Sequence, residues 1–248
     1  MLKLHNIQFS FAKSKVILDG VSMQLEQGEI YALMGTNGAG KSTLFNIITG
    51  FIKPQSGKIV FHSKNITTKR PFQINRLGIG RTFQDLRLIT KLSVRENILL
   101  TFKNNISDHW YATLFSSKKL KAQQKEFETR TDRILHNFHL TEVQEQLASA
   151  ISYGQQKLLT LACCVANDAD ILLLDEPVAG VNPVFREQMI KSIQSLKQQG
   201  KTILLIEHNT EFIEAVADSI FFLNEWKLTH YPNLSALKKD DNVINAYM

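Results

Sequence analysis

Apolar and polar residues follow two different periods along this chain of 248 residues. In the first part, alternation and short apolar runs predict strands over residues 2–9 and within 21–34, where Val21, Met23 and Leu25 alternate with polar residues. Another short strand is predicted at 59–61, after the turn-forming stretch 54–57. The N-terminal part is therefore expected to be rich in short strands.

From about residue 85 to residue 166 the apolar positions recur with a helical period, which predicts helices over 94–102, 121–138 and 155–165. Residues 104–119 show no sustained period, and we interpret them as an insertion. Buried strands return at 171–174 and 202–206, joined by a helix over 183–199 that ends at Gly200. This alternation is typical of an α/β protein.

The nine residues Gly35-Thr36-Asn37-Gly38-Ala39-Gly40-Lys41-Ser42-Thr43 contain the eight-position phosphate-binding loop pattern G-x-x-x-x-G-K-[ST], with Thr43 directly after it. An apolar run typical of a buried strand precedes them, and a helical stretch follows. The glycines let backbone N–H groups surround a β-phosphate, Lys41 brings a positive charge to the β- and γ-phosphates, and the Ser42 hydroxyl is suited to Mg²⁺. The alternative, a glycine-rich turn without a ligand, leaves this spacing and context unexplained.

Two carboxylates, Asp175 and Glu176, follow the apolar run 171–174. A carboxylate at the end of a strand beside a phosphate loop is suited to hold Mg²⁺ or its waters, and we assign that role to Asp175. Glu176 points the other way and is suited to orient or deprotonate the attacking water. The alternative is a strand that ends in a solvated acidic turn.

A second candidate anion site lies at Ile151-Ser152-Tyr153-Gly154-Gln155-Gln156, where a helix is predicted to begin. Backbone N–H groups at a helix start and the Ser152 hydroxyl favour an anion. The same pattern is also typical of an ordinary helix N-cap, and the residues alone leave both interpretations open.

Composition narrows the class of protein. The formal net charge of +6 is mild, so it permits contact with a membrane face without implying nucleic acid. No basic and apolar leader begins the chain, and no apolar run approaches the ~20 residues of a membrane-spanning helix, so we expect a soluble, cytosolic protein. Cys163 and Cys164 are adjacent in an apolar helical stretch, where we expect them to pack in the core.

The order of phosphate loop, Gln84, Ser-Tyr-Gly-Gln, Leu-Leu-Leu-Asp-Glu and His208 resembles the ATP-binding subunits of ABC transporters over nearly the whole chain. The tyrosine at position 153 resembles the residue at the same place in the subgroup that energises branched-chain amino-acid and urea importers. Three further segments also resemble this subgroup: Arg81-Thr82-Phe83-Gln84, Ala179-Gly180-Val181-Asn182-Pro183 and Val243-Ile244-Asn245-Ala246-Tyr247.

The resemblance implies a P-loop NTPase (ABC ATPase) core with a mixed sheet, an N-terminal antiparallel β subdomain and an inserted helical subdomain. Residues 1–248 are then a single ABC ATP-binding domain, in which 1–84 and 167–248 form the ATP-binding core and about 85–166 the helical subdomain. ATP and Mg²⁺ are the implied ligands. The implied partners are transmembrane permease subunits, a second ATP-binding subunit in a head-to-tail dimer, and a periplasmic or extracellular solute-binding protein, with no nucleic acid. The chain would lie in the cytoplasm, peripheral on the inner face of the cell membrane.

The resemblance also implies roles for single residues. Phe11 matches the aromatic residue that stacks on adenine, although the alternative is a core aromatic residue. Gln84 reaches Mg²⁺ and the attacking water, and His208 contacts the γ-phosphate unless it is merely a satisfied histidine at a strand end. The implied catalytic set is Glu176, His208, Gln84 and Lys41, and the implied metal ligands are Ser42, Gln84 and Asp175. Nucleotide contacts fall on Phe11, Gly35, Asn37, Gly38, Ala39, Gly40, Lys41, Ser42 and Thr43, and across the dimer on Ser152, Gly154 and Gln155.

Three departures from the family pattern are visible. Asn182 and Asn209 stand where many relatives have Asp, and the expected hairpin near 224–227 lacks the usual glycines. In the family, the stretch after Gln84, which here begins with Asp85 to Leu92, receives a cytoplasmic helix of the permease. Two other functions remain open, a lipid- or lipopolysaccharide-exporting subunit and a non-transport ATPase that acts on nucleic acid or ribosomes.

Overall fold

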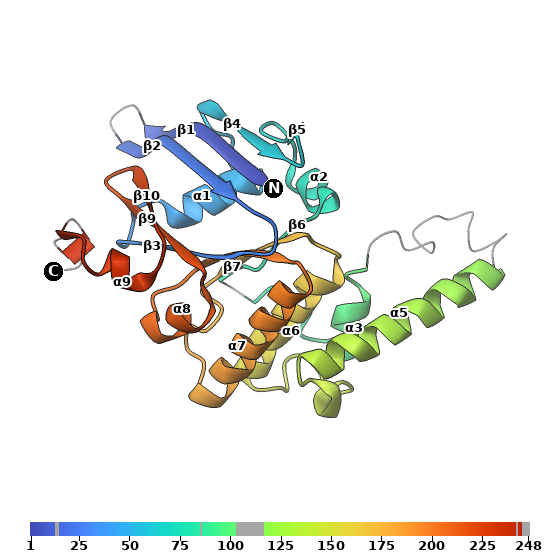
Figure 1. The fold of residues 1–248 in the computed structure, drawn as a ribbon. Coiled ribbons are helices and arrows are strands. Elements are labelled where there is room, and N and C mark those ends of the chain that lie inside the picture. The colour runs from blue at the N-terminus through green and yellow to red at the C-terminus, as the bar shows by residue number, and fades with distance from the viewer. Residues whose placement is uncertain (13–14, 85, 103–116, 242, 245–248) are drawn as a thin grey trace.

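The strands form two sheets, one antiparallel and one mixed (Figure 1). The structure is a computed structural model that describes residues 1–12, 15–84, 86–102, 117–241 and 243–244. The antiparallel sheet has the order β2-β1-β4-β5, with β1 at Leu2–Ala12, β2 at Lys15–Leu25, β4 at Ser56–Phe61 and β5 at Lys64–Asn65. The mixed sheet has the order β10-β9-β3-β8-β7-β6, and its strands are β3 (Ile30–Gly35), β6 (Ile79–Arg81), β7 (Ile171–Asp175), β8 (Thr202–Ile206), β9 (Ser219–Asn224) and β10 (Lys227–Tyr231).

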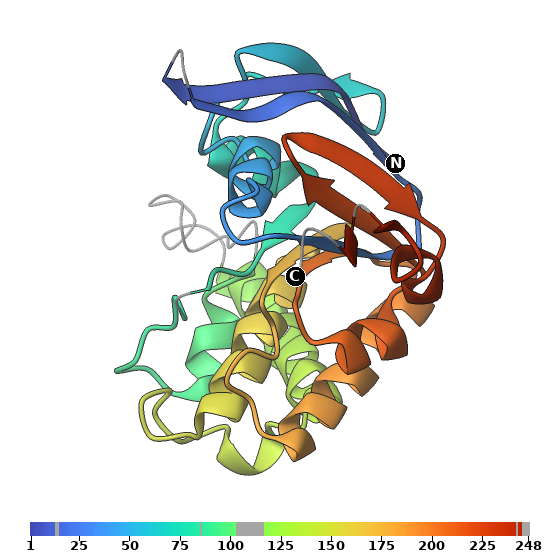
Figure 2. The ribbon, with the colours of Figure 1, turned by 90° about the vertical axis from the view of Figure 1, so that its left-hand side faces the viewer.

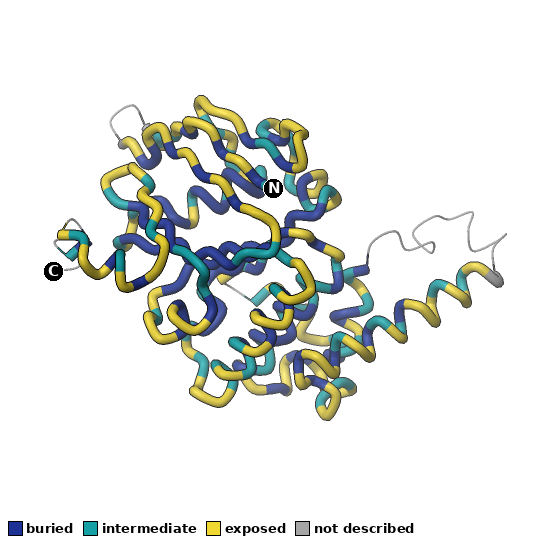
Figure 3. The backbone as a smooth tube through the Cα atoms, in the orientation of Figure 1, coloured by how far each residue is buried: buried dark blue, intermediate teal, exposed yellow. Residues whose placement is uncertain are grey.

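The mixed sheet is the middle layer of the molecule (Figure 2). Its central strands β3, β7 and β8 are buried along their whole length, as near-continuous apolar runs in a parallel sheet require. Because side chains alternate along a strand, Leu33, Leu173 and Leu204 pack toward α1 (Lys41–Ile48) and the antiparallel sheet. Their neighbours in sequence face the opposite side and pack against the helices. Buried backbone is accordingly concentrated at this sheet (Figure 3).

Helices cover the second face of the mixed sheet (Figures 1 and 2). The helical region after β6 contains α3 (Val94–Leu99), α5 (Ser117–Asn137), the 3-10 turn η2 (Thr141–Val143) and α6 (Tyr153–Ala166). On the same side pack α7 (Pro183–Gln198), α8 (Thr210–Val216) and α9 (Leu234–Leu237). Helix α2 (Pro71–Leu77) lies on the other side of the sheet, with α1 and the antiparallel sheet (Figure 1). Within the described residues, no helix combines the length and the apolar character that crossing a membrane requires.

Several boundaries differ from the sequence-based expectation. Strand β2 begins at Lys15 instead of residue 21, because it pairs along most of β1 with four register shifts that disturb the simple alternation. Most of the expected insertion 104–119 lies outside the described residues, but its last three residues already belong to α5. Pattern reasoning did not find the short elements α2, β6, α8 and α9, which are too brief to show a period.

The hairpin between β9 and β10 is well formed without glycine. Glu225 and Trp226 both adopt positive φ, at 44° and 68°, as a two-residue turn of the primed type requires. The Asp19 backbone N–H donates to the Trp226 carbonyl over 3.0 Å. This contact from β2 holds the strained turn, so the missing glycines did not prevent the expected hairpin.

Candidate active site

The phosphate-binding loop connects β3 to α1 across the end of the mixed sheet. At Gly35 an added Cβ would lie 2.2 Å from the Leu223 carbonyl oxygen, so the neighbouring strand β9 requires glycine there. Gly40 has φ 107° and is the N-cap of α1. An added Cβ at Gly40 would lie 2.9 Å from Ile17. At positions 35 and 40 the loop therefore has a shape that requires glycine, and it leaves the first N–H groups of α1 free of a side-chain cap.

Lys41 folds back over this loop. Its ammonium group donates to the Gly35 carbonyl over 2.7 Å and to the Thr36 carbonyl over 2.9 Å. Burial lowers the pKa of Lys41, and the negative charges of Glu176 and Asp175 act in the opposite direction. The ammonium thus lies at the loop in a largely desolvated position, where a phosphate oxygen is a stronger partner than a neutral carbonyl.

A pocket of about 340 Å³ opens beside the loop. Phe11 stands at this pocket with 63% of its surface exposed, so the alternative interpretation of Phe11 as a core aromatic residue is wrong. Seven of the expected site residues do not line the pocket itself: Gly35, Ala39, Gln84, Asp175, Ser152, Gly154 and Gln155. Its lining consists of Phe11, Ile17, Asn37, Gly38, Gly40, Lys41, Ser42, Thr43, Glu176, Ile206 and His208.

Glu176 occupies a constrained position directly after β7. Its backbone has φ 49°, in the left-handed region that residues other than glycine rarely adopt. The Glu176 N–H donates to the Ile206 carbonyl over 3.0 Å, and the Lys157 ammonium donates to the Glu176 carbonyl over 3.0 Å. These two backbone contacts hold the residue in place without using its carboxylate.

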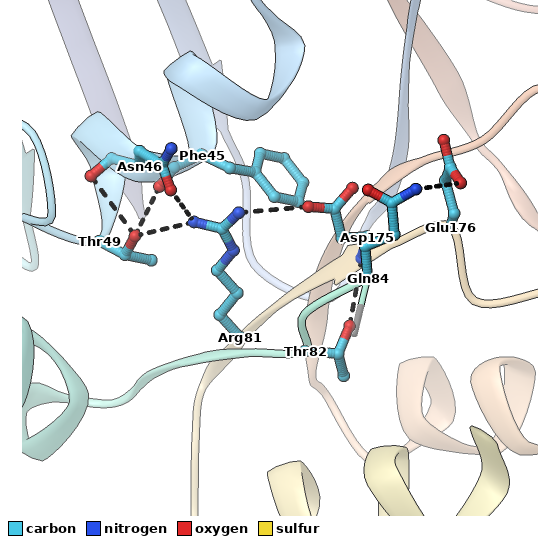
Figure 4. A network of polar contacts seen from close by, with 8 residues as sticks. All are labelled: Phe45, Asn46, Thr49, Arg81, Thr82, Gln84, Asp175 and Glu176. Carbon is cyan, nitrogen blue, oxygen red and sulfur yellow. Dashed lines mark hydrogen bonds and ion pairs between the residues drawn. The ribbon is translucent and has the colours of Figure 1, made fainter. Parts of the chain in front are cut away.

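The Glu176 carboxylate lies between two of the expected site residues. Gln84 donates from Nε2 to Oε2 over 3.4 Å (Figure 4), and His208 Nε2 lies 3.8 Å from Oε1. The structure therefore brings Gln84, Glu176 and His208 together from three separate segments of the chain. Such a group can bind and orient a water molecule next to a phosphate held by the loop.

Asp175 is the last residue of β7 and is buried. Arg81, at the end of β6, donates from Nη2 to Asp175 Oδ2 over 3.2 Å (Figure 4). The Asp175 backbone N–H donates to the Thr82 hydroxyl over 3.1 Å. The sequence shows Arg81 only as part of a family-like segment and does not predict its contact with Asp175, because it does not reveal that β6 is the neighbour of β7.

Sequence reasoning also missed Glu207, the residue before His208. It is only 3% exposed, and its carboxylate accepts hydrogen bonds from three backbone N–H groups. Oε1 accepts from Val178 over 2.9 Å, and Oε2 accepts from His208 over 3.0 Å and Asn209 over 3.3 Å. Glu207 therefore fixes the start of the loop after Glu176 to the segment that carries His208. Its position directly after the apolar run 202–206, like that of Asp175 after its own strand, was the available signal.

Removing the Glu207 carboxylate should destabilise the protein. Glu207→Ala leaves three N–H groups at a largely buried site without their acceptor, so we expect the free energy of unfolding to fall by about 2–4 kcal/mol in urea titrations. Glu207→Gln retains one acceptor oxygen and should lose less. Glu214→Ala, at an exposed position of α8, is the control and should stay within about 0.5 kcal/mol of the wild type. Equal stabilities of Glu207→Ala and Glu214→Ala would contradict this role.

The second candidate anion site has the geometry of a helix cap. Ser152 is the N-cap of α6: its hydroxyl accepts from the Gln155 N–H over 3.4 Å, and Gln155 Oε1 accepts from the Ser152 N–H over 2.9 Å. At Gly154 an added Cβ would lie 2.5 Å from the Phe185 ring, so close packing of α6 on α7 requires glycine. Of the described residues at the pocket, none belongs to 152–155. Within one chain, therefore, Ser152, Gly154 and Gln155 are not brought to the phosphate loop.

Asn182 and Asn209, which stand where many relatives have Asp, are both helix N-caps. Asn182 Oδ1 accepts from the Phe185 N–H at the start of α7, over 3.1 Å. Asn209 Oδ1 accepts from the Phe212 N–H at the start of α8, over 2.8 Å. Asparagine and aspartate serve equally well at such a position, so the local structure survives the change.

Comparison with known proteins places this site in a family. The ABC transporter family matches residues 18–179. The "High-affinity branched-chain amino acid transport ATP-binding protein LivG" of Salmonella typhimurium is 33% identical over 232 residues, 93% of this chain and 91% of its own length. The protein of the same name from Escherichia coli K12 is 31% identical, over 100% of this chain and 97% of its own length.

Solved structures agree with the sequence matches. A nucleotide-free ATP-binding cassette from an ABC transporter superposes with a TM-score of 0.84 at 29% identity, covering 100% of this chain and 98% of its own. An ATP-binding cassette of an ABC transporter in its ADP conformation superposes with a TM-score of 0.83, also at 29% identity and with the same coverage. These structures confirm the expected fold of mixed sheet, N-terminal antiparallel β subdomain and helical subdomain. The family match spans more than half of this chain, and the relatives align along almost all of the chain. The chain therefore belongs to the ABC transporter family as an ATP-binding subunit that hydrolyses ATP.

Proposed function

We propose that the chain powers a membrane importer for branched-chain amino acids or related small polar solutes. The catalytic part of this proposal rests on one observation: Gln84, Glu176 and His208 lie together beside the phosphate loop. In this proposal the Glu176 carboxylate takes the proton of the attacking water, Gln84 orients that water, and His208 and Lys41 contact the γ-phosphate. Phe11 stacks on the adenine, and the loop residues 35–43 surround the phosphates. The names of the relatives support the cargo.

We also propose that Mg²⁺ is held by Ser42, Gln84 and Asp175. The donor set fits the ion, because Mg²⁺ prefers one or two carboxylates together with hydroxyl or amide oxygens, waters and substrate phosphates over a dedicated cage of protein ligands. Among the described residues there is no cluster of three or more His, Cys, Asp or Glu that would form such a cage. When bound, the ion would neutralise negative charge on the phosphate oxygens. The protein's own part is to present Asp175 at the end of a rigid, buried strand.

The N-terminus of α6 is proposed to act on the nucleotide of a second subunit. Ser152, Gly154 and Gln155 lie away from the pocket of their own chain, yet Tyr153 beside them is 46% exposed. A head-to-tail dimer would place this helix start, with its partial positive charge, against the γ-phosphate in the partner's loop. A solved ATP-binding cassette with the same fold is described as dimeric in a post-hydrolysis state.

The proposed dimer has a direct test. We expect ATP, but not ADP, to promote association of the Glu176→Gln protein, since only ATP supplies a γ-phosphate for Ser152 and Gly154 to contact. Light scattering at matched protein concentrations measures this. Ser152→Glu places a negative charge at the proposed contact and should abolish the effect, while Ser149→Glu, three residues earlier at an exposed position, is the matched control. If neither ATP nor ADP promoted association, the hypothesis of a dimer of two identical chains would be contradicted. Mixing with a related ATP-binding subunit would then show whether the partner differs in sequence.

The remaining partners are transmembrane permease subunits and a solute-binding protein, with this subunit at the cytoplasmic face of the membrane. To test the cargo, the chain is reconstituted in vesicles with the permease subunits that co-purify with it. Binding protein loaded with leucine, isoleucine or valine should stimulate ATP hydrolysis and uptake, and binding protein loaded with an acidic amino acid should not. Stimulation by a lipid or lipopolysaccharide instead would favour an exporter, and activity that depends only on nucleic acid or ribosomes would favour a non-transport ATPase.

A further inference from the structure

Arg81 has a buried side chain that joins two parts of the ATP site (Figure 4). Nη2 donates to Asp175 Oδ2 on β7 over 3.2 Å. Nη1 donates to Asn46 Oδ1 over 2.6 Å and lies 3.4 Å from Thr49 Oγ1, both in or at the end of α1. The Arg81 side chain is 7% exposed and that of Asp175 is 8% exposed. The guanidinium therefore forms a fixed link between the helix that follows the phosphate loop and the proposed metal ligand.

The surroundings of this guanidinium are mostly aromatic. Its carbon lies 5.4 Å from the centroid of the Phe45 ring and 5.0 Å from that of Phe83. The buried Nε has no hydrogen-bond partner. Within the part of the chain that the structure describes, Asp175 is the acidic residue within 4 Å of Arg81. The positive charge is thus balanced mainly by one carboxylate.

A buried carboxylate is costly when it lacks a counter-ion. In the proposed function, Mg²⁺ arrives and leaves with each nucleotide, so it cannot balance Asp175 throughout the cycle. We propose that Arg81 is a positioning residue that serves as the permanent counter-ion of Asp175 and holds this carboxylate in its orientation when no metal is bound. This inference rests on the proposed role of Asp175 as a Mg²⁺ ligand.

The inference has a second consequence. A positive charge next to Asp175 also repels a divalent cation, so Arg81 weakens metal binding while it preorganises the carboxylate. Without Arg81, Mg²⁺ would become the main cation at Asp175, beside the more distant charge of Lys41. We therefore expect the protein without Arg81 to depend on metal for stability to a greater extent than the wild type.

A double-mutant cycle tests the counter-ion role, without nucleotide and in the presence of EDTA. Arg81→Met and Asp175→Asn each leave one member of the pair unbalanced, and each should lower the midpoint of thermal unfolding by roughly 10 °C. The double variant removes both charges and should recover more than half of the larger loss.

Arg87→Met is the matched control. The guanidinium carbon of Arg87 also lies close to the Phe83 ring, 3.5 Å from its centroid, but Arg87 is exposed. The unfolding midpoint of this variant should therefore change by no more than about 2 °C. Additive losses in the double variant, or equal losses for Arg81→Met and Arg87→Met, would overturn the inference.

The second measurement separates this inference from the proposed metal site. Adding Mg²⁺ with ADP should raise the unfolding midpoint of Arg81→Met more than that of the wild type, relative to ADP with EDTA. An equal rise in both proteins would overturn the inference. If Mg²⁺ raised the midpoints of the wild type and Asp175→Asn equally, the proposed role of Asp175 as metal ligand would fail, whatever the double-mutant cycle gave.

Arg81→Met alone can be too unstable to purify. In that case the double variant is compared with Arg81→Lys, which keeps a positive charge near Asp175 but cannot reach Asn46 at the same time. Recovery of folded protein from the double variant and from Arg81→Lys, with none from Arg81→Met, supports the counter-ion role. Failure of all three to fold shows that packing of the guanidinium dominates and overturns it.

Discussion

Glu176→Gln is expected to lower the rate of ATP hydrolysis by about 10²–10⁴-fold while nucleotide binding survives. The substitution keeps the size of the side chain and removes its ability to accept a proton. The backbone contacts that hold residue 176, to Ile206 and Lys157, do not involve the carboxylate and remain. The loss should therefore fall on the chemical step, and it should appear in single-turnover hydrolysis with the protein in excess over ATP.

Lys41→Ala is the comparison that separates chemistry from binding. Lys41 lies in the loop itself, with its ammonium against the Gly35 and Thr36 carbonyls. Its removal should weaken binding of ATP and ADP, which equilibrium titration measures directly. Hydrolysis by Glu176→Gln at a rate close to that of the wild type would show that another group accepts the proton, and His208, 3.8 Å from Glu176, would be the next candidate.

The parts of the fold that were predicted correctly are those where one local signal suffices. Strands β7 and β8 are continuous apolar runs that end at polar residues, and the phosphate loop has a fixed spacing whose glycines allow few other shapes. The helices α6 and α7 were found because each has a strong cap and a long apolar face. For such segments, local propensity and tertiary packing agree.

The parts that were missed depend on which segments meet in space. Arg81 and Asp175 are 94 positions apart, and Lys157 contacts a backbone carbonyl 19 positions away. Their residue types are ordinary, and only the strand order and the packing of α6 give them a role. Glu207 is a similar case, because its position after a buried strand is the available signal, but that signal alone does not distinguish a carboxylate that joins two loops from a solvated one. The family resemblance predicts which residues contact ligand, but it does not point to the residues that hold those residues in place.

The segment after Gln84 is anchored to the helical region and leaves one apolar side chain exposed. Asn97 Oδ1 accepts from the Ile89 N–H over 2.9 Å, and Asn97 Nδ2 donates to the Ile89 carbonyl over 3.1 Å. The Leu92 carbonyl accepts from the Ala148 N–H over 2.9 Å, four residues before Ser152. Leu88 packs partly against the helix-side core, whereas Ile89 is 51% exposed. The segment thus connects Gln84 with the start of α6 and leaves the Ile89 side chain exposed at its surface.

This arrangement predicts that Ile89→Asp and Arg87→Glu abolish substrate uptake while ATP binding and much of the basal hydrolysis survive. A movement of Gln84 with the γ-phosphate would shift the segment against a permease helix, and a charge at the exposed contact would break that connection. Leu88→Asp should have the same effect on uptake, but its partial burial makes it prone to destabilise the fold, so Ile89 is the sharper probe. Asp85, which begins this segment, lies outside the described residues.

The control is Trp226→Asp, a similarly exposed apolar residue in the turn between β9 and β10. That hairpin is at the edge of the mixed sheet opposite to β6, from which the segment emerges, so the charge should not reach the permease contact. Co-purification with the permease and uptake in vesicles are measured for each variant, beside basal hydrolysis in detergent. Normal uptake by both Ile89→Asp and Arg87→Glu would refute the coupling surface, and equal losses in Trp226→Asp would show that any added surface charge is harmful. A direct contact between this segment and the permease requires that uptake and co-purification are lost together, and that only the two segment variants lose them.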